Sequence, residues 1–125
     1  MSRFDGFVPG RHQLDAFGAG GFRFAGMSHR GSVLALPSGI RIWPVSRFSD
    51  VTPATFQPVL DEAESIDFLL IGTGADIAFI PHDWRALLKE RGVTVEGMAT
   101  GAAARTYNVL VAEERRVAAA LIAVD

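Results

Sequence analysis

The residues best suited to chemistry lie in two short segments rich in glycine and threonine. Gly72-Thr73-Gly74 directly follows an apolar run, and Thr100-Gly101 opens a helical pattern that carries Arg105 one turn later. Glycine turns and helix N-termini present backbone N–H groups that bind anions, and an arginine adds positive charge. The two segments are therefore a candidate small-molecule or anion site. Its candidate ligand-binding residues are Gly72, Thr73, Gly74, Thr100, Gly101 and Arg105.

Each segment also has a purely structural interpretation. Residues 72–77 share the first two glycines of a dinucleotide-binding fingerprint, but the sixth residue is Ile77 instead of Gly or Ala. A tight turn that needs positive φ explains these glycines as well. Thr100 is a favourable N-cap residue, so helix capping alone explains the second segment. The pattern leaves both interpretations open.

Other reactive side chains form no catalytic or metal-binding pattern. His12, His29 and His82 lack the spacing of metal ligands, and the chain has no Cys. His82-Asp83 is explained by a favourable charge at a helix start. The segment 26–31 departs from a nucleophile elbow, G-x-S-x-G, because Arg30 stands where that motif needs its second glycine. We expect no catalytic residues, no metal and no cofactor, which favours a non-enzymatic protein.

Composition limits the class of protein further. The chain has 125 residues, of which 49% are hydrophobic and 21% charged, so we expect one compact domain. A net charge of −2 argues against a nucleic-acid binder, which normally carries a basic face. The start resembles neither a secretory signal nor a mitochondrial presequence, and no apolar run is long enough to span a membrane. We expect a soluble, cytoplasmic protein.

The elements that would position the two segments follow from hydrophobic periodicity. We expect an irregular N-terminal arm over residues 1–20 and a single α/β domain over 21–125. The order β-β-β-α-β-α-β-α-β predicts three layers, with a mixed, mainly parallel central sheet. The first three strands are joined by tight turns and are expected to form an N-terminal antiparallel β-meander. Strands are expected at 22–26, 33–36, 40–43, 67–71, 93–95 and 116–124, a turn at 28–31, and helices within 52–63, 81–91 and 100–114.

Parallel pairing of the strands at 67–71 and 93–95 would bring both segments to one sheet edge. The loop after each strand would then leave the carboxyl end of the sheet, where open α/β sheets bind their ligands. The position of the candidate site therefore depends on this topology.

Four segments of the chain resemble a family of small α/β domains catalogued as of unknown function. Its mitochondrial members include NADH:ubiquinone oxidoreductase (complex I) assembly factor three, and a vertebrate relative is described as adipogenesis-associated. The resemblance covers about residues 17–124 and rests on Asp67–Gly74, Met98-Ala-Thr100, Ala104-Arg-Thr-Tyr-Asn108 and Glu113–Val117.

The resemblance implies a three-layer fold with a mixed sheet and no established activity for most members. It adds Tyr107 and Asn108 to the matched positions, and Asn108 joins the candidate ligand-binding residues. It also suggests a bacterial, cytoplasmic interaction or assembly protein that binds a protein partner, such as respiratory-complex subunits or their assembly proteins. A small anionic ligand at the two segments is the alternative.

Overall fold

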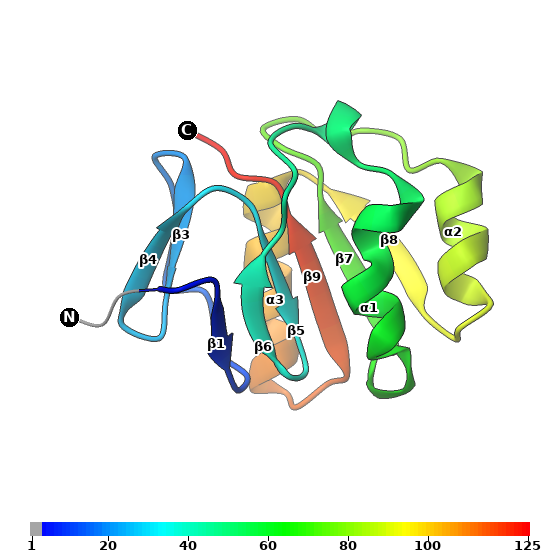
Figure 1. Cartoon of the computed structure of the whole chain (residues 1–125), viewed down its shortest axis with the longest axis horizontal. Coiled ribbons are helices and arrows are strands. Elements are labelled where there is room, and N and C mark those ends of the chain that lie inside the picture. The colour runs from blue at the N-terminus through cyan, green and yellow to red at the C-terminus, as the bar shows by residue number, and fades with distance from the viewer. Residues whose placement is uncertain (1–3) are drawn as a thin grey trace.

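A six-stranded mixed sheet forms the centre of the molecule (Figure 1). The computed structural model describes residues 4–125, and residues 1–3 lie outside the described part. The strand order is β1-β6-β5-β9-β7-β8. These strands are β1 (Phe7–Pro9), β5 (Val33–Leu36), β6 (Gly39–Ile42), β7 (Phe68–Gly72), β8 (Thr94–Met98) and β9 (Val117–Leu121).

The two halves of this sheet pair differently. β7 lies between β8 and β9 and runs parallel to both, so that Leu70 faces Glu96 on one side and Ala119 on the other. β5 pairs antiparallel with β9 and with β6, and β1 adds antiparallel to β6. β7 is almost wholly apolar because both of its faces are covered.

Helices cover both faces and complete three layers. Short 3₁₀ turns, α1 (Gln57–Asp61) and α2 (His82–Lys89) pack Phe56, Val59, Trp84 and Leu88 against one face. On the other face, α3 (Thr100–Ala112) buries Ala103, Ala104 and Tyr107. Pro58 lies in the first turn of α1, where its missing N–H costs no helical hydrogen bond.

A second, three-stranded antiparallel sheet packs beside α3. It consists of β2 (Ala16–Gly18), β3 (Gly21–Phe24) and β4 (Met27–Arg30). Both hairpins have two-residue turns with positive φ, at Ala19-Gly20 and Ala25-Gly26, the geometry of type I′ turns. Phe22 and Phe24 of β3 join the same core as Tyr107.

The predicted fold class, three-layered α/β with a mixed central sheet and an antiparallel meander, is confirmed. Several details differ. The central sheet is not mainly parallel, because β5 pairs antiparallel with β9 and β6, and β1 pairs antiparallel with β6. Residues 28–31, expected to form a turn, mostly belong to β4, because Ser28 and Arg30 alternate with less exposed Met27 and His29 in a half-buried strand. The expected strands at 33–36 and 40–43 pair with each other in the main sheet, not with the strand at 22–26.

The first 20 residues, expected to be an irregular arm, contain β1 and β2 within their described part. Long-range hydrogen bonds order this segment. The Asn108 side chain accepts from the Leu14 N–H at 2.7 Å and donates to the Leu14 carbonyl at 2.8 Å. Arg11 donates to the carbonyl of Val117 at 3.2 Å. Within residues 4–125, no helix is both long and apolar enough to cross a membrane.

Candidate functional site

The two glycine- and threonine-containing segments meet at the carboxyl edge of the sheet, as the parallel topology predicts. The Thr73 N–H donates to the Met98 carbonyl at 2.8 Å, and the Thr100 N–H donates to the Gly74 carbonyl at 2.8 Å. These bonds tie the residues after β7 to the start of α3. We call Gly72, Thr73, Gly74 and Thr100 the junction.

Thr100 is fully buried, and its hydroxyl joins three segments. It donates to the Ile122 carbonyl at 2.7 Å and accepts from the Gly74 N–H at 3.0 Å. The expectation that Thr100 caps α3 is wrong: it is the first helical residue, Ala99 precedes the helix, and no side-chain capping bond forms. The hydroxyl is instead committed to the ends of β7 and β9.

Thr73 shapes the loop between β7 and α2. Its hydroxyl lies 2.7 Å from the Asp76 carbonyl, 3.1 Å from the Met98 carbonyl and 3.1 Å from the Ala78 N–H, which donates to it. Its side chain is buried, at 5% exposure. The Thr73 hydroxyl therefore holds the loop residues Asp76 and Ala78 close to the end of β8.

Close packing requires glycine at position 72, and backbone conformation favours glycine at position 74. A Cβ at Gly72 would lie 2.8 Å from Cδ2 of Leu121 and 3.0 Å from Cα of Thr100. Gly74 has a φ of +114°, which favours glycine, and its missing Cβ faces open space. The structural interpretation of this turn accounts for both residues.

The remaining candidates lie farther along α3 and contact the N-terminal segment. A Cβ at Gly101 would lie 3.1 Å from the ring of Phe17, and the Arg105 guanidinium carbon lies 5.6 Å from that ring's centroid. Asn108 holds Leu14, as described above. Four candidates thus meet at the junction and three do not. All contact the protein itself, so ligand binding by these residues stays a prediction.

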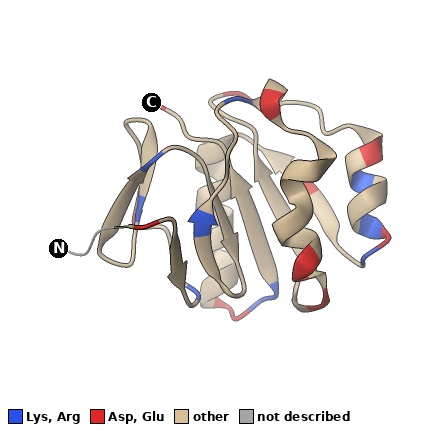
Figure 2. Ribbon diagram, in the orientation of Figure 1, with Lys and Arg blue, Asp and Glu red and all other residues tan. Residues whose placement is uncertain are grey.

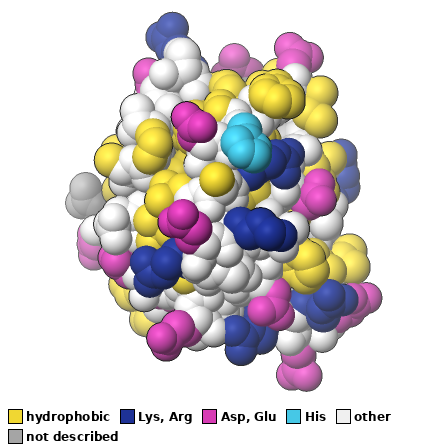
Figure 3. Space-filling model, turned by 90° about the vertical axis from the view of Figure 1, so that its right-hand side faces the viewer, with side chains coloured by type: hydrophobic (Ala, Val, Ile, Leu, Met, Phe, Trp, Pro, Cys, Tyr) yellow, Lys and Arg dark blue, Asp and Glu magenta, His cyan; other side chains and the backbone are white. Residues whose placement is uncertain are grey.

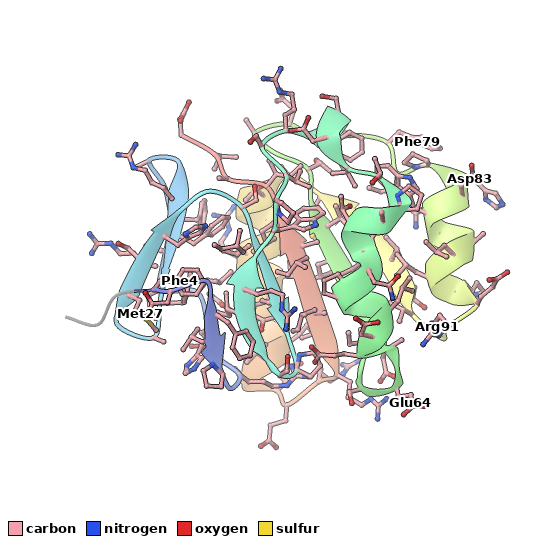
Figure 4. All side chains as sticks on the ribbon, in the orientation of Figure 1. Phe4, Met27, Glu64, Phe79, Asp83 and Arg91 are labelled. Atoms are coloured by element: carbon pink, nitrogen blue, oxygen red, sulfur yellow. The ribbon has the colours of Figure 1, made fainter. Side chains whose placement is uncertain are left out.

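Sequence reasoning missed the most exposed feature of this edge. Ile77 and Phe79 lie in the loop above the junction with 70% and 83% of their surfaces exposed. Phe79 projects at the end of the molecule where α2 begins, the end that also carries Asp83 (Figure 4). An apolar Ile-x-Phe pair inside a loop with Gly and Asp is the available signal, but in the sequence pattern Ile77 stands out only as a mismatch to a glycine motif.

Two titratable groups elsewhere are affected by burial. Burial lowers the pKa of His29 below its usual value, and it raises the pKa of Tyr107 to about 12, opposed by the nearby positive charge of Arg11. Neither group lies at the junction. Among residues 4–125, no group of three or more His, Asp or Glu side chains is arranged to hold a metal ion.

Comparison with known proteins connects this geometry to a family. A model for proteins of unknown function (DUF498/DUF598) matches residues 14–122. An uncharacterised protein of Rhodobacter capsulatus is 42% identical over 119 residues, covering 95% of this chain and 87% of that protein. The crystal structure of a protein described as an outer membrane protein from Bartonella henselae superposes with a TM-score of 0.90 at 49% identity, covering 94% of this chain and 98% of that one.

One named relative is the NADH dehydrogenase (ubiquinone) 1 alpha subcomplex assembly factor 3 of Danio rerio. It is 34% identical over 102 residues, covering 82% of this chain. The chain spans 59% of that relative's length. The resemblance inferred from the sequence is confirmed, and the chain belongs to the family of proteins of unknown function described as DUF498/DUF598.

Proposed function

We propose that this protein is a non-enzymatic assembly factor that binds a protein partner through the loop above the junction. The observation that carries the proposal is the exposed pair Ile77 and Phe79, with 70% and 83% exposure. Large apolar side chains in water favour association, and aromatic anchors often dominate binding energy at protein interfaces. We define Ile77 and Phe79 as the loop tip.

The loop tip is held in place before any partner binds. Thr73 anchors the loop at one end through its hydroxyl. At the other end Ile80 is buried, at 2% exposure, against Gly97 of β8, where a Cβ would lie 2.7 Å from Ile80. A preorganised loop loses little conformational entropy on binding, which strengthens the contact.

The surroundings of the loop tip resemble the rim of an interface. Asp76, His82 and Asp83 are exposed and flank the apolar pair in the sequence. Figure 3 shows that charged and hydrophobic side chains are interspersed on the face formed by α2 and β8. An apolar centre with a polar rim is typical of protein interfaces.

Strand addition to the main sheet is a less favourable way to bind a partner. The outer side of β8 is occupied in part by Arg85, whose Nη1 donates to the Val95 carbonyl at 2.7 Å. At the other edge, β1 has only three residues and ends at Pro9, which lacks an N–H. Both devices oppose pairing with an added strand. This favours a partner with an apolar pocket that receives the side chains of the loop tip.

The relatives' name supplies the identity of the proposed partner. We infer that the partner is a subunit or assembly protein of the respiratory NADH dehydrogenase, because the Danio rerio relative is named as an assembly factor for that complex. The proposal places this activity in the cytoplasm, as the sequence leads us to expect.

Affinity capture of the tagged full chain from cells that express it tests the proposal. We expect NADH dehydrogenase subunits or assembly proteins to be enriched at low and high salt, because an apolar contact is weakly screened. The double variant Ile77→Ser/Phe79→Ser should lose this enrichment. Val109→Ser is the matched control, since Val109 is 56% exposed on α3. Equal enrichment by the double variant, or no respiratory protein with the unaltered chain, would contradict the proposal.

A further inference from the structure

The three-stranded sheet carries an open cavity of about 470 Å³. This volume is within the range of small-molecule sites, roughly 300–1,000 Å³. Its lining includes Arg23 of β3 and Ser28 and Arg30 of β4, and within the described chain no Asp or Glu lines it. The whole chain has a net charge of −2, so this cavity is a local concentration of positive charge.

Strand register places the two arginines on one face. Arg23 is opposite Ser28, and Arg30 is opposite Gly21. Side chains alternate across a strand, so these residues point away from the face on which Phe22 and Phe24 are buried. Arg23 and Arg30 are diagonal neighbours, and such positions lie about 7–8 Å apart, within reach of two long side chains that contact one ligand.

Two glycines, Gly18 and Gly21, line the cavity beside Arg30. A Cβ at Gly21 would collide with the carbonyl oxygen of His29, and Gly18, also on the lining, has a φ of +123° that favours glycine. Register places Gly18 opposite Gly21. The row across the three strands thus reads Gly18, Gly21, Arg30, so the surface beside Arg30 carries no side chain on β2 or β3.

Within residues 4–125, neither Arg23 nor Arg30 forms an ion pair, so their side-chain N–H groups can contact a ligand. Asp15 lies beside Arg23 in an adjoining hollow of about 230 Å³, outside the lining of the larger cavity. Most other described arginines have a partner: Arg11, Arg85, Arg91 and Arg116 donate to backbone carbonyls, and Arg41, Arg105 and Arg115 lie over aromatic rings.

We propose that this cavity binds a phosphate group, carried by a small molecule or by a lipid headgroup. Two guanidinium groups present planar pairs of donors that match phosphate oxygens, and the Ser28 hydroxyl adds one further donor. Figure 2 shows the basic residues on β3 and β4, at the opposite end of the molecule from α2. The cavity is thus separate from the loop tip and independent of the proposed assembly function.

Titration of the ¹⁵N-labelled full chain with sodium pyrophosphate, at constant ionic strength, tests a soluble ligand. We expect saturable shifts of the amide signals of Gly18, Gly21, Arg23 and Arg30. A second arm measures cosedimentation with phosphatidylglycerol vesicles, compared with pure phosphatidylcholine vesicles. Pyrophosphate binding identifies a soluble phosphate source. Cosedimentation with phosphatidylglycerol vesicles, without pyrophosphate binding, identifies a lipid headgroup. Both outcomes support the proposal.

Matched charge variants decide whether the cavity is responsible. Arg23→Gln and Arg30→Gln should each weaken binding about tenfold, as expected for loss of a charged hydrogen bond. Lys89→Gln removes the same charge from an exposed position at the end of α2 and should leave binding unchanged. The amide spectrum of each variant verifies its fold. Absence of binding in both arms, unchanged binding by the two Arg variants, or equal weakening by Lys89→Gln would overturn the proposal.

Discussion

The junction and the loop tip are neighbours, because Gly72–Gly74 of the junction directly precede the loop that carries Ile77 and Phe79, yet their surroundings are opposite. At the junction the hydroxyls of Thr73 and Thr100 are buried and bonded to the protein. At the tip Ile77 and Phe79 lie in water. Buried polar groups require partners within the protein, whereas exposed apolar groups gain free energy when another surface covers them. The junction, which has the stronger ligand-binding pattern in the sequence, thus anchors the loop tip, which we propose binds a partner.

The largest expected effect comes from removing the hydroxyl of Thr100. Thr100→Val keeps the shape but leaves the Gly74 N–H and the Ile122 carbonyl without this partner. We expect the free energy of unfolding to fall by about 3 kcal/mol, since each unsatisfied buried group costs about 1–3 kcal/mol. Urea denaturation measures the change, and Thr100→Ser should retain most of the stability. A Val variant as stable as the original would show that the junction is not held by this hydroxyl.

A smaller loss is expected when the junction is overpacked. Gly72→Ala places a Cβ 3.0 Å from Cα of Thr100, which cannot move without shifting the start of α3. We expect a loss of about 2 kcal/mol in the same assay, because overpacking a core typically costs about 1–3 kcal/mol. Ala75→Ser, in the exposed part of the same loop, serves as the control. Equal stability of the two variants would contradict the close packing.

Tyr107 tests whether burial or hydrogen bonding makes a hydroxyl stabilising. Its OH is buried on the same helix as Thr100 but has no hydrogen-bond partner within residues 4–125. Tyr107→Phe is therefore expected to raise the free energy of unfolding by about 1 kcal/mol, opposite in sign to Thr100→Val. A marked loss of stability, measured by thermal or urea unfolding, would show that the hydroxyl has a favourable partner.

The pH dependence of stability provides a second readout of Tyr107. Burial raises its pKa to about 12 in the folded protein, against the ordinary value of 10.0. The unfolded chain loses its proton first, so stability is complete below about pH 10 and falls as pH rises toward 12. Tyr107→Phe should remove this contribution. An identical alkaline profile for both proteins would contradict the assignment.

The smallest effect on stability is expected at the loop tip. Ile77→Ser/Phe79→Ser changes side chains that are mostly in water, so we expect less than about 0.5 kcal/mol in urea denaturation. The same variant is expected to lose partner capture. A large loss of stability would show that the tip packs against its own protein, and the contrast with the junction would disappear.

Local sequence signals predicted the C-terminal part of the fold well. The apolar run of β7, the helical spacing of α3 and the parallel pairing of β7 with β8 all follow the expected pattern. β4 was missed because Ser28 and Arg30 resemble turn residues, although they occupy the exposed face of a strand. The assignment of β3 and β5 to different sheets depends on long-range contacts that short windows do not contain.

The candidate site was predicted in position but not in its contacts. Parallel strands must end at the same edge, so the meeting of Gly74 and Thr100 could be anticipated. The partners of Thr100 and Asn108 could not, since Ile122 and Leu14 are 22 and 94 residues away along the chain. The same limit applies to Arg23 and Arg30, whose shared cavity requires the register of β3 and β4.

The sequence by itself determined the α/β class, most of the C-terminal elements and the family, because periodicity and local motifs are properties of neighbouring residues. Only the tertiary structure decided which hydroxyls are bonded internally and which side chains stay in water. Ile77 and Ile80 look alike in the sequence, yet Ile80 is buried at 2% exposure and Ile77 is 70% exposed. Burial depends on what packs above a residue, and that is set by segments far away along the chain.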